Sequence, residues 1–280
     1  MDLFRYWQER KTLIDAKIDD FINQNGDWNI IELSKYMLRD GKRFRGLLVM
    51  LVAEFFGSSE EKAIDGALAV EILHAASLAL DDIMDGDLER RGKKAAWVVF
   101  GNKKVILATN YLIPSALRII SKYGDEALKI SVDLWRNIGV GALRDTFETP
   151  DYIDIIELKT GSFFELSTAL GIFASGESTY LPEALQLGRS LGIQYQIIDD
   201  YMDILKFKGK LDKLIGSAAV LYKNFGKNVE EYVNTQLDYY MRLYLSTLGE
   251  IKIDNEYRKI MSDLPQLFLS QLKAEELSSG

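Results

Sequence analysis

Apolar side chains recur at the three- and four-residue spacing of amphipathic helices through most of the chain. The first example is the stripe formed by Leu3, Trp7, Ile14 and Phe21. No stretch alternates like a strand, and proline occurs only 4 times, which favours helices throughout. The pattern predicts helices at about residues 3–21, 30–39, 47–56, 105–123, 125–148 and 151–176, one that begins after Ser59, one that begins at Pro182, and two or three more beyond residue 213.

Short turns, rather than long linkers, separate these predicted helices. Asn25-Gly26-Asp27 and Thr149-Pro150-Asp151 are typical helix boundaries. We find no segment of low complexity and no repeat of the solenoid type. We therefore expect a single all-α domain that covers residues 1–280.

The composition narrows the class of protein. Hydrophobic residues make up 48% of the chain, which is enough for a sizeable core. The net charge of −8 argues against a general nucleic-acid binder, and the absence of cysteine excludes disulfides and thiolate chemistry. Because no apolar run spans a bilayer and the N-terminus lacks a signal core, we expect a soluble cytoplasmic protein without a transmembrane segment.

Two acidic clusters of the same pattern follow apolar helical segments. Carboxylates at positions i and i+4 share one face of a helix and lie about 6 Å apart. Two copies of this spacing on two separate helices are hard to explain as surface decoration. The clusters are Asp81, Asp82 and Asp85 in the first helix and Asp199, Asp200 and Asp203 in the second.

Clustered carboxylates repel one another, so an inward position is costly unless a cation neutralises them. Mg²⁺ takes hard oxygen ligands and keeps positions for water and phosphate. Two facing clusters would hold Mg²⁺ and a diphosphate, and Arg90 and Arg91 would bind the remaining phosphate oxygens. A solvated helix end explains either cluster alone equally well; both clusters with the arginine pair favour the metal–diphosphate site.

Other polar residues match an anion site less specifically. Lys42 and Arg45 lie in a glycine-flanked turn between two helices, where they would also suit a helix cap. His74, the only histidine, lies about two helical turns before Asp81. Taken alone, each residue fits an ordinary polar role, and a nearby polyanion site makes each a candidate phosphate ligand. Further candidates of this kind are Lys159 and Thr160 inside one predicted helix and Gln196 on the face of Asp199.

Taken in order, these motifs resemble the trans-isoprenyl (polyprenyl) diphosphate synthase family, most closely its archaeal hexaprenyl diphosphate synthases. The matching blocks run from about residue 37 to 205. The resemblance implies a single all-α bundle of the isoprenoid synthase type with a central apolar cavity, Mg²⁺ dependence and a homodimer. The blocks are Gly41-Lys42-Arg43-x-Arg45, His74-Ala-Ala-Ser-Leu, Asp81-Asp82-x-x-Asp85, Arg90-Arg91-Gly92, Phe100-Gly101, Lys159-Thr160 and Tyr195-Gln196-x-x-Asp199-Asp200-x-x-Asp203.

The resemblance also implies a role for each matching residue. The principal Mg²⁺ ligands would be Asp81, Asp85 and Asp199, with Asp82, Asp200 and Asp203 in support. The diphosphate of isopentenyl diphosphate would be bound by Lys42, Arg45, His74 and Arg91. The allylic diphosphate would be bound by Arg90, Lys159, Thr160 and Gln196. The residues expected to act in catalysis are Asp81, Asp82, Asp85, Arg90, Lys159 and Asp199.

The chain departs from the family pattern at several positions. Leu80 stands where many members have a histidine, and Asn110 replaces a common aspartate. The flap after the second cluster lacks its second Gly-Lys pair, which leaves open which lysine closes over the phosphates. The candidates are Lys206, Lys208 and Lys210.

Small residues before the first cluster predict a long product. Ala76 and Ser77 lie about one turn before Asp81, where an aromatic ring would block a growing chain. We therefore expect a product longer than C20 and near C30, with Phe163 or Phe164 as the floor of the channel. Ordinary helix packing is the alternative explanation for the two small residues.

Three alternative functions remain open. A geranylgeranyl or geranylfarnesyl diphosphate synthase would use the same chemistry and release a shorter product. A non-catalytic partner subunit of such an enzyme would be expected to have damaged acidic clusters, and both are intact here. A terpene cyclase would share the first cluster and would need neither the second cluster nor Lys42 and Arg45.

Overall fold

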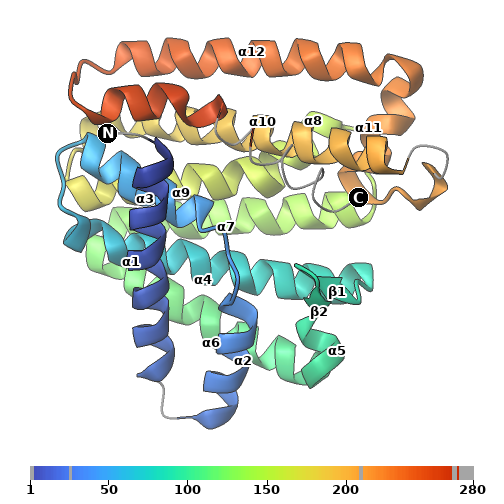
Figure 1. Ribbon diagram of the computed structural model, residues 1–280, viewed down its shortest axis with the longest axis horizontal. Helices are drawn as coiled ribbons and strands as arrows, with labels where there is room; N and C mark the ends of the chain where they lie inside the picture. Colours follow the sequence, from blue (N-terminus) through green and yellow to red (C-terminus); the bar gives the residue numbers. More distant parts are fainter. Residues whose placement is uncertain (1–2, 25–26, 208–210, 267–269, 271–280) are drawn as a thin grey trace. The chain divides into compact units, whose positions relative to one another are not determined.

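The computed structural model describes residues 3–24, 27–207, 211–266 and 270, and these residues form an almost entirely helical fold (Figure 1). The all-α class expected from the hydrophobic pattern is confirmed. Residues 257–266 are also helical. The helices are α1 (Leu3–Asn23), α2 (Trp28–Leu38), α3 (Phe44–Phe55), α4 (Glu60–Asp85), α5 (Ala96–Phe100), α6 (Asn102–Ile120), α7 (Asp125–Thr146), α8 (Tyr152–Ile156), α9 (Ser162–Ser175), α10 (Leu181–Lys206), α11 (Gly216–Phe225) and α12 (Val229–Glu250).

The chain divides into two compact units. The first unit contains Phe4–Val132 and Ala169–Glu177. The second unit contains Leu3, Asp133–Thr168 and the described residues from Ser178 onward. The expectation of one domain over residues 1–280 with a central apolar cavity stays a prediction.

Helix α4 is the core helix of the first unit, where it packs against α3 and α6. Every residue of α3 is buried. Gly46 lets α3 approach α4 closely, since a Cβ there would lie 3.1 Å from Cγ of Glu71. Among the described residues, only α4 is long and apolar enough to cross a membrane, and 67% of its apolar window is buried within the protein.

Helix α10 has the corresponding place in the second unit, where it packs against α8, α11 and α12 (Figure 1). The apolar core between these helices includes Tyr152, Ile193, Ile197 and Leu221. The helix begins with Pro182 in its first turn, as the sequence predicted. Its C-terminal end carries the second acidic cluster.

Three local features differ from the sequence-based expectation. Ser59 precedes α4 as its N-cap residue, but its side chain makes no capping hydrogen bond. A short antiparallel hairpin joins β1 (Glu89–Arg90) to β2 (Lys93–Lys94) just after the first acidic cluster. The helix expected over residues 151–176 is interrupted by a π-helical turn at Glu157–Gly161. Such turns are rare and frequently occur at functional sites.

Candidate active site

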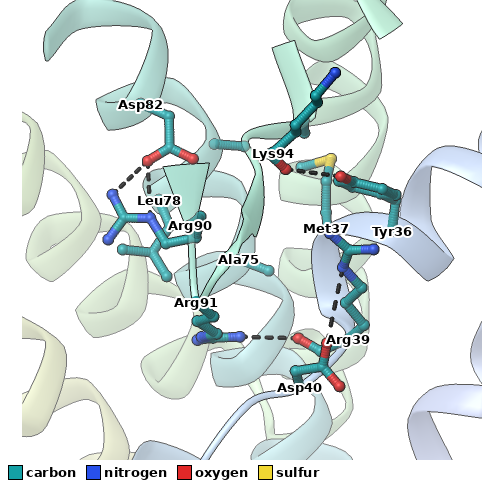
Figure 2. A pocket seen from close by; sticks show the side chains of 12 residues that line it. Tyr36, Met37, Arg39, Asp40, Ala75, Leu78, Asp82, Arg90, Arg91 and Lys94 are labelled. Carbon is teal, nitrogen blue, oxygen red and sulfur yellow. Dashed lines mark hydrogen bonds and ion pairs between the residues drawn. The ribbon is translucent and has the colours of Figure 1, made fainter. Parts of the chain in front are cut away.

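The three aspartates of the first cluster differ in exposure. Asp85 is exposed and Asp81 is partly exposed, whereas Asp82 is only 3% exposed. Oδ1 of Asp82 accepts hydrogen bonds from Nε of Arg90, at 2.8 Å, and from Nη2 (Figure 2). Burial raises the pKa of Asp82, and the Arg90 guanidinium opposes that shift. Asp82 therefore fixes Arg90, while Asp81 and Asp85 present the accessible carboxylates.

The second cluster repeats this division. Asp199 is exposed and Asp203 is partly exposed, whereas Asp200 is 3% exposed. In both clusters the second aspartate therefore points into the protein. The first and third aspartates of each cluster, four positions apart, share the accessible face of the helix end.

Asp200 is surrounded by hydrogen-bond donors. Its Oδ2 accepts from the hydroxyl of Tyr152, and its Oδ1 accepts from Nε2 of Gln196 and from Oγ of Ser217, each at 2.9 Å. Burial raises the pKa of Asp200 to about 8, although Gln196 and Ser217 oppose this. Three donors thus hold this side chain in one orientation beside Asp199.

The acidic clusters fit Mg²⁺ that is shared with a ligand. Among the residues that the structure describes, no group of three or more His, Cys, Asp or Glu side chains is placed to hold a metal ion by itself. Mg²⁺ usually binds one or two carboxylates together with water and substrate phosphates. The accessible pairs Asp81/Asp85 and Asp199/Asp203 offer the hard oxygen donors that such an ion requires.

A pocket in the first unit lies beside Asp82 (Figure 2). Its volume is about 40 Å³, compared with about 10–15 Å³ for one water. Guanidinium groups and apolar side chains line the pocket together, so an anion with a small apolar group would suit it. The cationic lining residues are Arg39, Arg90, Arg91 and Lys94, the apolar ones are Tyr36, Met37, Ala75, Leu78, Ala79 and Ala96, and the acidic ones are Asp40 and Asp82.

The β1–β2 hairpin holds Arg91 at this pocket. Arg91 and Gly92 both have positive φ, 53° and 69°, as the two-residue hairpin turn of type I′ requires. Nη1 of Arg91 donates to the backbone oxygen of Arg39 at 2.9 Å (Figure 2), and Nζ of Lys93 donates to Oδ2 of Asp40 at 2.6 Å. These contacts bind the hairpin to the turn before α3, and burial lowers the pKa of Arg91.

Arg45 and His74, which the family resemblance assigned to the same diphosphate, lie next to each other. Nη1 of Arg45 lies 3.2 Å from Nε2 of His74. Burial, and then the charge of Arg45, lower the pKa of His74 well below its usual value. We therefore assign a neutral imidazole whose Nε2 accepts a hydrogen bond from Arg45. Lys42 lies in the same turn, with Nζ 5.6 Å from the centre of the Phe44 ring.

The neighbouring Arg43 has a different role from Lys42 and Arg45. Its side chain is buried. Nε of Arg43 donates to Oδ1 of Asp15 at 2.7 Å, and Nη1 lies 3.6 Å from Oε2 of Glu71. Arg43 therefore joins α1 and α4 and belongs to the scaffold rather than to the surface of the basic turn.

Two further predicted residues lie in the π-helical turn of the second unit. Nζ of Lys159 forms an ion pair with Oδ2 of Asp145 at 2.6 Å. Oγ1 of Thr160 donates to Oε1 of Gln196 at 2.7 Å. Of the candidate flap lysines, Lys206 is the last residue of α10 and is exposed; the other candidates, Lys208 and Lys210, lie outside the described residues.

The residues expected to set product length are all at least partly buried. Ala76 is completely buried and Ser77 is partly buried, and neither lines the pocket of Figure 2. Phe163 packs edge-on against Trp135, with ring centroids 5.9 Å apart. Phe164 is completely buried. Their role in chain length stays a prediction.

Several residues in contact with the predicted site were not predicted. Arg39 and Asp40 directly precede the Gly41-Lys42 motif, and Ser217 lies in the flap region, so proximity in sequence was an available signal. Asp145 and Tyr152 are isolated in sequence and only the fold brings them to Lys159 and Asp200. The five residues are Arg39, Asp40, Asp145, Tyr152 and Ser217.

Sequence comparisons find close relatives of this chain. A family model described as polyprenyl synthetase matches residues 29–219. The hexaprenyl pyrophosphate synthase of Saccharolobus solfataricus is 47% identical over 277 residues, which are 98% of this chain and 98% of the relative. The geranylfarnesyl diphosphate synthase of Methanosarcina mazei is 31% identical over 74% of this chain and 73% of its own length.

Solved structures agree with the sequence comparisons. The geranylgeranyl pyrophosphate synthetase of Geoglobus acetivorans has a TM-score of 0.81 at 24% identity and shares the fold over 94% of this chain and 98% of its own. The geranylgeranyl pyrophosphate synthetase of Pyrococcus horikoshii has a TM-score of 0.76 at 26% identity, covering 95% and 98% of the two chains. The chain therefore belongs to the polyprenyl synthetase family, a family of prenyltransferases.

Proposed function

We propose that this protein is a Mg²⁺-dependent prenyltransferase that condenses isopentenyl diphosphate head-to-tail with farnesyl or geranylgeranyl diphosphate. The product would be an all-trans chain near C30, hexaprenyl diphosphate. The observation that carries the proposal is the 47% identity, over 98% of both chains, with a hexaprenyl pyrophosphate synthase. The repeated arrangement of accessible and buried aspartates at the ends of α4 and α10 supports it.

The proposed chemistry needs no protein nucleophile. Bound Mg²⁺ would supply positive charge that stabilises the leaving diphosphate as the allylic C–O bond ionises. The accessible carboxylates Asp81, Asp85, Asp199 and Asp203 would hold it. The double bond of isopentenyl diphosphate then forms the new C–C bond with the allylic cation, and a proton is lost, for which the released diphosphate is a suitable acceptor.

The two substrates would use different sets of residues. Arg91 and Arg45 with His74 all belong to the first unit, as does Lys42, and these four would bind isopentenyl diphosphate. The pocket beside Arg91 offers guanidinium groups and apolar side chains to a small prenyl diphosphate. Its two carboxylates, Asp40 and Asp82, are already paired with Lys93 and Arg90. The allylic diphosphate would be bound by Arg90, Lys159, Thr160 and Gln196, of which Arg90 is already oriented by Asp82.

We also propose a homodimer. Exposed apolar side chains recur at three- and four-residue spacing on α6 and at the end of α7, so that each set shares one helix face. They are Ile106, Leu107 and Tyr111 on α6, Val140 and Leu143 on α7, and Phe147 directly after α7. A cytoplasmic location stays a prediction.

The experiment that tests the function is incubation of the purified protein with Mg²⁺, farnesyl diphosphate and labelled isopentenyl diphosphate. We expect labelled products longer than C20, mainly hexaprenyl diphosphate, and loss of activity when the metal is chelated. Products that stop at C20 or C25 would favour the shorter-chain alternative. A cyclic hydrocarbon would indicate a terpene cyclase, and no incorporation at all would favour the non-catalytic subunit.

The product length has its own test. We expect Ala76→Phe to shift the products toward shorter chains, because an aromatic ring one turn before Asp81 would block the growing tail. Chromatography of the dephosphorylated products gives the distribution, and Ala63→Ser, near the other end of α4, serves as the control. An unchanged distribution in Ala76→Phe would show that this position does not set the length.

A further inference from the structure

The π-helical turn that carries Lys159 and Thr160 is contacted closely by two helices. On one side, a Cβ at Gly141 of α7 would lie 2.3 Å from the backbone nitrogen of Lys159. On the other side, a Cβ at Gly192 of α10 would lie 2.8 Å from Cα of Gly161. Both contacts are to backbone atoms, so only glycine permits either approach.

Each of these glycines is followed, one helical turn later, by the side chain that binds the turn. Asp145 is four residues after Gly141 and forms the ion pair with Lys159 at 2.6 Å. Gln196 is four residues after Gly192 and accepts the hydrogen bond from Thr160 at 2.7 Å. Because residues four apart share a helix face, the close approach at each glycine aims the following side chain at the turn.

Asp145 makes a second contact, at the start of α11. Its Oδ1 accepts a hydrogen bond from the backbone nitrogen of Ser217 at 2.6 Å. Gly216 has a positive φ of 58°, and a Cβ there would lie 2.7 Å from the same Oδ1. A carboxylate at a helix N-terminus satisfies an otherwise unpaired amide and is stabilised by the helix dipole.

The same serine connects Asp145 to the second acidic cluster. While the backbone of Ser217 donates to Asp145, its Oγ donates to Oδ1 of Asp200 at 2.9 Å. The Asp145 side chain is 14% exposed and that of Lys159 is 26% exposed, so the ion pair is only partly screened by water. One carboxylate thus joins Lys159 to the scaffold that orients Asp200.

We propose that Asp145 is a positioning residue that holds the Lys159 ammonium in place for the allylic diphosphate. Through Ser217 it also keeps the ammonium at a fixed position relative to the second acidic cluster. Lysine has a long flexible stem, and a fixed partner removes much of the entropy that phosphate binding would otherwise cost. The inference rests on the proposed function, in which Lys159 binds the allylic substrate. Asp145 itself touches no substrate in this proposal.

The test is a double-mutant cycle between Asp145→Asn and Lys159→Ala. Asparagine keeps the size of Asp145 and an acceptor for Ser217, and it removes the charge that faces Lys159. We expect Asp145→Asn to lower kcat/KM for farnesyl diphosphate by about 10- to 100-fold and to leave KM for isopentenyl diphosphate within about twofold. In the Lys159→Ala background the same substitution should change kcat/KM by less than about threefold, because its partner is already absent.

A binding measurement separates this inference from the proposed function. We expect Asp145→Asn to weaken binding of the unreactive farnesyl thiodiphosphate, measured by calorimetry with Mg²⁺, by at least about tenfold. If the wild-type protein binds this analogue with that difference but forms no product, Asp145 retains its role and the proposed function fails. If the effects of the two substitutions simply add, or Asp145→Asn binds like wild type, the role assigned to Asp145 is wrong.

The controls address folding. Asp133→Asn lies on the same helix with a 57% exposed side chain, and it should leave every parameter unchanged. Should Asp145→Asn not fold, Asp145→Ser keeps an acceptor near Ser217 and enters the same cycle. A role in stability alone would lower the melting temperature and the amount of active enzyme, without the selective effect on the allylic substrate.

Discussion

At the residue scale, each acidic cluster buries one aspartate and surrounds its carboxylate with hydrogen-bond donors. A buried carboxylate is costly unless donors surround it, and Asp82 and Asp200 each have such donors, from Arg90 in one case and from Tyr152, Gln196 and Ser217 in the other. These inward aspartates fix the helix ends and their neighbours. The accessible aspartates on the same helix ends are the carboxylates that we propose as Mg²⁺ ligands.

His74 provides a prediction at this scale that needs no substrate. Because burial and Arg45 lower its pKa, its titration midpoint should lie below its ordinary value of 6.5, and Arg45→Gln should raise it. As pH falls below about 6.5, the unfolded chain binds a proton that the native imidazole does not, so the folded state loses stability. Since the chain has one histidine, its ring protons can be followed by NMR without assignment.

The control for this titration is Arg5→Gln, whose side chain is 77% exposed on α1. It should leave the midpoint unchanged. A wild-type midpoint at or above 6.5, or no response to Arg45→Gln, would contradict the neutral His74 described above.

At the element scale, the hydrophobic period predicts most helices to within a few residues, because each helix buries one continuous stripe. The π-helical turn at Glu157–Gly161 was not predicted. Gly141 of α7 and Gly192 of α10 both contact this turn, and these tertiary contacts cannot be read from the hydrophobic period. The direction of a side chain was equally unpredictable from sequence. Nothing in the motif Lys42-Arg43-x-Arg45 indicates that Arg43 points inward and donates to Asp15. For the same reason Asp145, one of three aspartates on α7 and part of no recognised motif, carried no signal.

Gly141→Ala tests the contact between α7 and the turn. The added methyl would lie 2.3 Å from the Lys159 backbone, and the resulting displacement should lower the free energy of unfolding by about 1–3 kcal/mol. Gly139→Ala, two residues earlier, meets no atom within 4 Å and should raise it by up to about 1 kcal/mol through helix propensity. Urea denaturation of both variants gives the comparison, and equal stabilities would rule out a close contact at Gly141.

At the scale of the whole molecule, the family model spans residues 29–219 and so includes parts of both compact units. Every residue predicted to bind metal or substrate lies within that span. The exposed apolar residues on α6 and at the end of α7 are a separate feature of the molecule, and the proposal of a dimer rests on them.

The prediction at this scale concerns assembly. We expect the wild-type protein to have twice the chain mass of 31.8 kDa by light scattering. Leu143→Glu combined with Phe147→Glu should give the monomer, because two charges would have to be desolvated in an apolar interface. Leu245→Glu, at a side chain that is 45% exposed on α12, is the control and should stay dimeric. A wild-type monomer would contradict the proposed assembly.

The central proposal is that the accessible carboxylates of each cluster hold Mg²⁺ for the diphosphate substrate. The most direct measurement is the single-turnover rate of Asp81→Asn and Asp199→Asn with farnesyl diphosphate, labelled isopentenyl diphosphate and saturating Mg²⁺, beside Asp238→Asn, which is 71% exposed on α12. We predict that each of the first two rates falls by at least about 10²- to 10³-fold while the third stays at the wild-type value. A rate close to wild type in either cluster variant would contradict the claim.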